Sequence, residues 1–314
     1  MIVLDITFPQ FTWNLWPDVW QMFQYEFMRN AFLAGTALSI VSGLVGYFVL
    51  VRHQAFAGEA LSDVAFTGAV GGAVLGINPL AGMIILTIVA ALTMGSFALR
   101  IGERDIAVGT VLAWVLGLGV LFLSLLTNHT SGSTGFSGVT VLFGSILSIS
   151  VSQMWVTVAV SAGIGLVLLI IARPLLFASL DPDVASARGV PVRLLGLVFM
   201  VLLAMTVAES VQAVGALLVF ALLLLPAAIA QRLTTRPYVG LGLAAGLAVL
   251  STWLGLTIGF YSGLPSSVCI SLLVFIGYVS VVGFSALRQR LADRRQGANS
   301  SSGATESNTH QAIR

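Results

Sequence analysis

The 314-residue chain contains no lysine and has few charged residues of any kind. Only 8% of its residues are charged and 58% are hydrophobic, whereas a soluble domain carries about 25% charged and about 45–50% apolar residues. Disordered chains and nucleic-acid-binding proteins need far more charge than this. The composition therefore excludes both classes, predicts no nucleic-acid partner, and indicates a polytopic protein whose surroundings are a lipid bilayer.

The absence of lysine and the small number of cysteines and histidines exclude particular chemistries. A chain without lysine lacks the Walker-A lysine, so it is not a P-loop ATPase by itself. Its single cysteine, Cys269, excludes a disulfide framework and a CxxC metal site. His53, His129 and His310 are far apart in sequence, and HExxH and GxSxG motifs are absent. We therefore expect no enzyme activity, no catalytic residue and no permanently bound cofactor.

Long apolar stretches dominate what is present. A helix needs about 20 mostly apolar residues to cross a bilayer, where its backbone must satisfy its own hydrogen bonds, so these stretches predict helices rather than strands. We expect an all-α fold with eight or nine spans. The number depends on how residues 58–78, which contain acids, and the short segment at 140–150 are assigned. The candidates are residues 30–51, 58–78, 80–99, 106–127, 152–173, 194–211, 213–232, 238–259 and 265–287.

Arginines mark the connections between spans. They occur at Arg52, at 100 and 104, at 188 and 193, at 232 and 236, and in the C-terminal tail, whereas residues 127–138 carry no charge. The positive-inside rule places the arginines in the cytoplasm and residues 128–138 outside, with the N-terminus outside as well. Residues 140–150 are then a short re-entrant or interfacial piece.

The two ends differ from the transmembrane domain at 30–288. Residues 1–29 are rich in Trp, Tyr and Phe among polar residues, which is typical of a helix at the headgroup level; an exposed arm is the alternative. Residues 289–314 are polar, and we expect a disordered cytoplasmic tail.

Three acids lie inside apolar stretches, where a carboxylate is a functional candidate because its insertion is costly. Glu59 and Asp63 are one turn apart on one helix face and would repel each other unless a cation lies between them, which predicts a divalent-metal site with Ser62 and Thr67 as nearby oxygen donors. The alternative is that both acids lie at the cytoplasmic start of the helix, stabilised by its dipole or by an arginine.

Glu209 is near the outer end of its span, where a position at the rim competes with a role as a ligand. Residues 181–193 form the one substantial cytoplasmic interlude. Within it, Asp181 and Asp183 precede a short helix that ends at Arg188 and Gly189. Such a capped helix is suited to docking a soluble partner, although a plain connector has the same pattern.

Between about residues 30 and 288 the chain resembles the permease subunits of the metal-ion ABC transporter family, which import manganese, zinc or ferrous iron. Five segments carry the resemblance in the right order: FAGEALSDVAFTG at 56–68, LFGSILSIS at 142–150, DPDVASARGVPV at 181–192, GALLVFALLLLPAAIAQRL at 215–233 and YSGLPSSVCI at 261–270, where Ser267 replaces the usual glycine.

The resemblance implies the permease fold of that family in a bacterial plasma membrane. It implies a partner permease, either a second copy or a paralogue, with separate ATP-binding cassette subunits on the coupling loops at Asp181, Asp183, Arg188 and Gly189. It also implies an extracytoplasmic metal-binding protein that delivers the ion.

One departure concerns the metal site. The family's pair on this helix is an acid followed by His, so Glu59 matches the acid while Asp63 replaces the imidazole. Two carboxylates favour a harder ion such as manganese over zinc. Alternatively, the site has changed to another cation, or a partner permease supplies the His. The other readings are a permease for cobalamin or iron–siderophore complexes, and a stand-alone secondary transporter or membrane enzyme.

Overall fold

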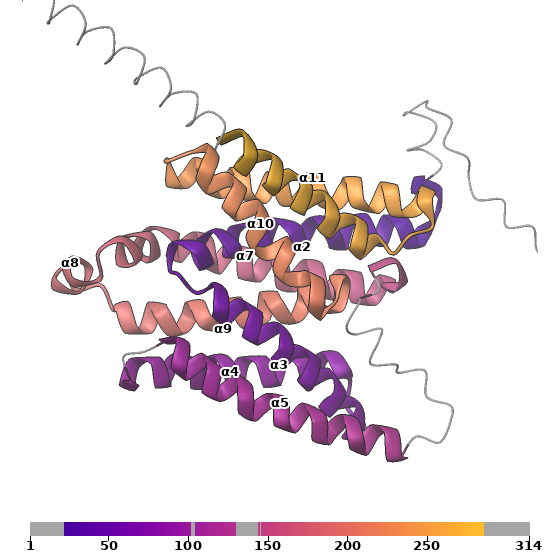
Figure 1. Ribbon diagram of the computed structural model, residues 1–314, viewed down its shortest axis with the longest axis horizontal. Helices are drawn as coiled ribbons and strands as arrows, with labels where there is room; N and C mark the ends of the chain where they lie inside the picture. Colours follow the sequence, from indigo (N-terminus) through magenta and orange to yellow (C-terminus); the bar gives the residue numbers. More distant parts are fainter. Residues whose placement is uncertain (1–21, 102–103, 130–143, 145, 286–314) are drawn as a thin grey trace, which may run out of the picture.

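The computed structural model describes residues 22–101, 104–129, 144 and 146–285, and in this part of the chain nine long helices run roughly side by side (Figure 1). They are α2 (Glu26–Val51), α3 (Ala55–Val74), α4 (Pro79–Ile101), α5 (Arg104–His129), α7 (Val151–Leu180), α9 (Val192–Val214), α10 (Ala216–Leu233), α11 (Pro237–Ser262) and a last helix, Ser266–Ser285. Two short helices accompany them, η1 (Ile146–Ser148) and α8 (Pro182–Ala187).

Each predicted span coincides with one of these long helices, and the described residues contain no strand, as expected. Seven of the helices are long and apolar enough to cross a membrane by length and composition alone. The other two are α3, which carries Glu59 and Asp63, and α10, whose apolar part is shorter. The chain is an all-α, multi-pass membrane protein.

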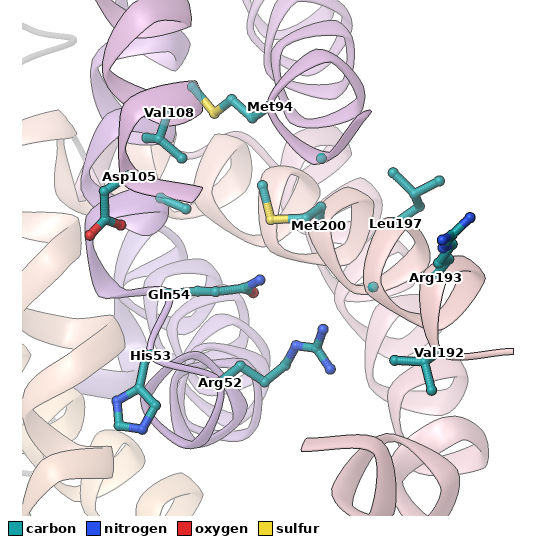
Figure 2. Close-up of a pocket in the computed structure, with 13 residues that line it drawn as sticks. Arg52, His53, Gln54, Met94, Asp105, Val108, Val192, Arg193, Leu197 and Met200 are labelled. Atoms are coloured by element: carbon teal, nitrogen blue, oxygen red, sulfur yellow. The ribbon is translucent and has the colours of Figure 1, made fainter. Parts of the chain in front are cut away.

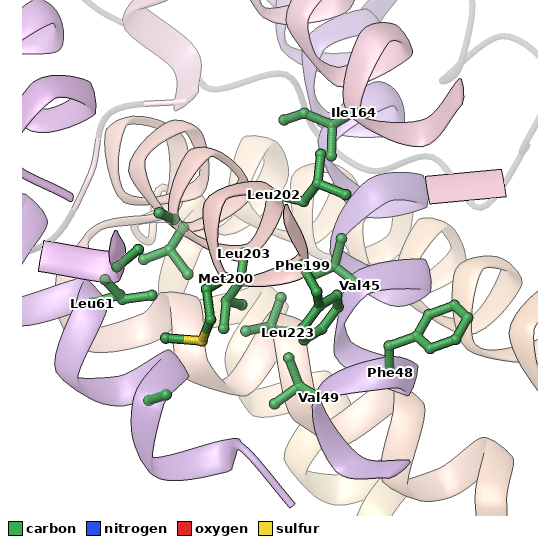
Figure 3. Packing of buried hydrophobic residues seen from close by; sticks show 14 of the residues in the cluster. Val45, Phe48, Val49, Leu61, Ile164, Phe199, Met200, Leu202, Leu203 and Leu223 are labelled. Carbon is green, nitrogen blue, oxygen red and sulfur yellow. The ribbon is translucent and has the colours of Figure 1, made fainter. Parts of the chain in front are cut away.

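Helix α2 lies at the centre of the bundle and packs against α7, α9, α10 and α11. It is far more buried than a helix that faces lipid, because its neighbours cover it on nearly every side. Its residues Val45, Phe48 and Val49 meet Phe199 of α9 and Leu223 of α10 in the main apolar core (Figure 3). This core fixes α9 against the helices around it.

Glycines allow the closest approaches between helices. A Cβ atom at Gly46 of α2 would lie 1.8 Å from the carbonyl oxygen of Leu223, and one at Gly82 of α4 would lie 2.3 Å from the carbonyl oxygen of Gly68 in α3. Neither position tolerates a side chain, because both obstacles are backbone atoms. Small residues let membrane helices pack without the hydrophobic driving force that acts in water.

The arginine-bearing connections lie at one end of the bundle. Figure 1 shows the α2–α3 and α10–α11 turns, the last turn of α4 and the first turn of α5 at the same end as α8, and the α3–α4 and α9–α10 turns at the opposite end. This arrangement agrees with the expected orientation, in which the α8 end is cytoplasmic. We name the two ends of the bundle cytoplasmic and outer after this predicted orientation.

The short segment predicted at 140–150 is described in part. Gly144 has φ +70 and packs so tightly that a Cβ there would lie 2.5 Å from the backbone nitrogen of Gly215, at the α9–α10 turn. Ile146 and Ile149 beside it are buried. This piece therefore packs on the outer end of the bundle, where α2 and α9 contact η1.

The predictions for the chain ends lie mostly outside the described residues. Residues 1–21 and 289–314 are not described, so the aromatic segment and the tail remain predictions. Residues 26–29 belong to α2, which begins four residues before the predicted span.

Candidate metal centre on helix α3

Helix α3 begins immediately after a tight turn at the cytoplasmic end of α2. His53, an exposed residue with φ 52, makes this turn, and α3 starts two residues later at Ala55. The Arg52 guanidinium turns toward α7 and α9: it donates to Ser179 Oγ at 3.3 Å and lies 5.5 Å from the centre of the Phe199 ring.

The two predicted acids lie on one exposed face of α3. Phe56 and Glu59 are exposed, and Asp63 and Phe66 are half-buried. The spacing of three, four and three residues places all four side chains on a single stripe of the helix. We call these four residues the α3 stripe; the opposite face of α3 is buried against α4, α5, α9 and α10.

The structure does not bring Ser62 and Thr67 onto this stripe. Both side chains are buried, and Ser62 Oγ donates to the backbone oxygen of Glu59 at 2.8 Å. Thr67 faces α5, where a Cβ at Gly119 would lie 2.7 Å from its Oγ1. The α3 stripe therefore offers two carboxylates without these hydroxyls.

The positions of Glu59 and Asp63 along α3 limit what can pack against these two side chains. At 1.5 Å per residue, Asp63 lies about 12 Å from the first residue of a helix about 30 Å long. A carboxylate at such depth costs about 2.5–3.5 kcal/mol if it faces lipid. Within the part of the chain that the structure describes, no three His, Cys, Asp or Glu side chains come together to hold a metal. A metal ion bound by the α3 carboxylates would therefore need further ligands from elsewhere.

Glu209 occupies a separate place in α9, nearer the outer end. It is only 4% exposed, and Ser161 of α7 donates to its Oε2 at 3.1 Å. Beside it, Ser210 pairs with Ser42 of α2 at 3.1 Å between hydroxyl oxygens. Glu209 is therefore enclosed between helices, and it is not a neighbour of the α3 stripe.

A cavity of about 310 Å³ lies at the cytoplasmic end, next to the start of α3 (Figure 2). Arg52, Gln54 and Arg193 line it together with Asp105 of α5 and Met200 of α9. Sequence reasoning does not find this cavity, because its residues come from four helices that are far apart along the chain. It lies on the buried side of α3, toward α4, α5 and α9, and neither acid lines it.

Helix α8 has the form predicted for residues 181–189. In α8 the Asp181 side chain accepts a hydrogen bond from the Val184 amide at 3.0 Å, and the helix is followed by Gly189 with φ +81. Ala185 is buried, whereas Asp183 and Val184 are exposed. Arg188 turns back, with its guanidinium 5.7 Å from the centre of the Phe177 ring in α7. The structure thus attaches α8 firmly to α7 and leaves its outer face open.

Comparison with known proteins shows which family and which proteins the chain is similar to. A model of the ABC 3 transport family matches residues 24–285. The manganese import system permease protein ScaB of Streptococcus parasanguinis is 31% identical over 268 residues, which cover 85% of this chain and 93% of that protein. The high-affinity zinc uptake system membrane protein ZnuB of Haemophilus influenzae is 30% identical and covers 80% of this chain and 96% of its own.

A solved structure agrees with these matches. The chain superimposes on PsaBC from Streptococcus pneumoniae, solved in complex with Fab, with a TM-score of 0.73 and 26% sequence identity. The superposition covers 84% of this chain and 94% of the other.

Proposed function

The chain belongs to the ABC 3 transport family and is a multi-pass permease of the bacterial plasma membrane, and we propose that it imports manganese through a path lined by the α3 stripe. The single observation that carries this proposal is the pair of carboxylates on one face of α3, with Glu59 exposed and Asp63 half-buried.

The α3 stripe must contact something other than lipid. Two carboxylates exposed to hydrocarbon would together cost several kcal/mol, so the α3 stripe must meet water or another protein surface. We propose that a second permease, in the simplest case a second copy of this chain, packs opposite it. Two copies related by a twofold axis would bring two Glu59 and two Asp63 carboxylates to one central path.

The donor set favours a hard ion. Carboxylate oxygens suit manganese and magnesium, whereas zinc binds best to imidazole and thiolate. The manganese permease ScaB among the relatives supports this choice, and ZnuB keeps zinc as the alternative cargo. The ion is the substrate, and it replaces the mutual repulsion of the acids with attraction to both.

Energy comes from a separate subunit. The chain has no lysine for a Walker-A motif, so we assign ATP hydrolysis to an ATP-binding cassette partner that docks on α8. Helix α8 contacts α7 and α9, and α9 in turn packs against α3. A movement of α8 therefore reaches the α3 stripe through a single intervening helix. An extracytoplasmic metal-binding protein would deliver the ion at the other end.

The test removes the charges and keeps the shape. In a strain that lacks its own manganese importer, the double variant Glu59→Gln, Asp63→Asn should reduce uptake of radiolabelled manganese to background, while its amount in the membrane stays unchanged. Glu26→Gln is the matched control, because Glu26 is an exposed acid in the first turn of α2, away from the α3 stripe. Normal uptake by the double variant would reject the site.

A further inference from the structure

A second polar cavity lies at the end of the bundle opposite the arginines. It measures about 220 Å³ and lies between the α3–α4 turn, the first turns of α7 and the last turns of α9. Its polar lining residues are Asn78, Ser152, Gln153, Thr157, Glu209 and Gln212. This is the end at which an ion arrives from outside.

We propose that this outer cavity is a second, transient binding site for the incoming divalent cation, with Glu209 as its anionic ligand. The proposal rests on the import of a divalent ion proposed above, and it adds a station that the ion occupies before it reaches the α3 stripe.

Burial of Glu209 without a basic neighbour in the cavity is the first argument. The side chain is 4% exposed, and the described residues that line the cavity include no Arg or His. Its only hydrogen bond recorded among the described residues is the one that Ser161 donates to Oε2. A buried carboxylate is stable when a cation or a proton balances it.

The neutral oxygens around Glu209 form the second argument. Thr157 lies one turn before Ser161 on the same buried face of α7, and Gln212 lies one turn after Glu209 in α9. The amide oxygen of Asn78 accepts one backbone hydrogen bond, from Leu80 at 3.0 Å, and retains a second lone pair, whereas that of Gln153 accepts from both the backbone nitrogen and the hydroxyl of Ser150, at 3.1 and 3.2 Å. Oxygen donors of this kind suit hard divalent ions.

With a single carboxylate, the cavity is better suited to an ion in transit than to a permanently bound ion. A site with one carboxylate and several neutral oxygens binds a divalent ion weakly, and an ion in transit must leave as readily as it enters. The cavity has room for the ion and several waters, since a water occupies about 30 Å³ in the liquid. The ion can therefore enter without losing its whole hydration shell.

The experiment measures equilibrium binding of radiolabelled manganese to the permease with its ATPase subunit in nanodiscs. In the Glu59→Gln, Asp63→Asn background we expect weak binding to persist. Adding Glu209→Gln should weaken this remaining binding at least tenfold, whereas adding Glu26→Gln should leave it unchanged. Glutamine keeps the size of the side chain and an oxygen that accepts from Ser161.

A second variant keeps the test decisive if Glu209→Gln does not fold. Thr157→Val removes one hydroxyl from the cavity with little change of shape, and we expect it to weaken the remaining binding several-fold. Remaining binding that is insensitive to both variants, or absent before either is made, would overturn the outer site. That result is distinct from the failure of the α3 site, which would show as normal uptake by the α3 double variant.

Discussion

At the scale of single residues, we propose that position 63 determines which ion the permease prefers. Glu59 and Asp63 lie on the exposed α3 stripe, and the pattern of the family places His where this chain has Asp63. A carboxylate at this position makes the donor set all-oxygen, which favours manganese. An imidazole there would add the ligand that suits zinc.

We predict that Asp63→His shifts transport toward zinc. In uptake assays with both ions present, the ratio of zinc to manganese transported should rise several-fold relative to the unmodified chain. Asp63→Asn is the control, because it removes the charge without adding a nitrogen ligand, and it should lower the uptake of both ions. An unchanged ratio in Asp63→His would show that position 63 does not touch the ion.

The sequence predicts the placement of some site residues and not of others, and the reason is physical. The shared face of Glu59 and Asp63 follows from helix geometry alone, so the sequence predicts it. The enclosure of Glu209 depends on Ser161, which is 48 positions away in another helix, and only packing brings them together. The same applies to Thr67, whose buried position depends on how closely α5 approaches at Gly119.

At the scale of elements, α8 is a two-turn helix that depends on its cap. A helix this short is not stable by itself. The Asp181 side chain satisfies the Val184 amide, and Ala185 is buried where α8 meets its neighbours. If the ATPase docks on α8, the cap controls the docking surface.

Removal of the cap should therefore weaken docking. Asp181→Ala loses about 0.5–2 kcal/mol of helix stabilisation, whereas Asp181→Asn removes the charge and keeps a capping oxygen. We expect the ATPase subunit to co-purify at a several-fold lower yield with Asp181→Ala and at nearly normal yield with Asp181→Asn. Equal losses in both variants would mean that the charge of Asp181, and not the shape of α8, holds the partner.

The elements themselves were largely predictable, because apolar length and arginine placement are strong signals in membrane proteins. All nine predicted spans correspond to helices, with boundaries shifted by at most seven residues; the largest shift is at the end of α7 (Val151–Leu180). The packing of Gly144 against the α9–α10 turn was not predictable. It depends on a backbone contact between segments about 70 residues apart.

At the scale of the whole molecule, we propose that one copy of the chain is an incomplete transporter. Its described residues hold two carboxylates on one face of α3, an outer cavity with a third, and the capped helix α8 at the opposite end. We expect each of these features to act only with an added component: a second permease, an arriving ion and an ATPase. We propose that two permeases meet across their α3 stripes and bind the ion there.

The most direct test of this claim is an anomalous difference map, measured at the manganese absorption edge, of the permease–ATPase complex crystallised with manganese. We predict a peak beside the Glu59 and Asp63 carboxylates, with the α3 stripes of two permeases facing each other across it. A map with no peak there, in a complex whose α3 stripes face lipid, would contradict the account.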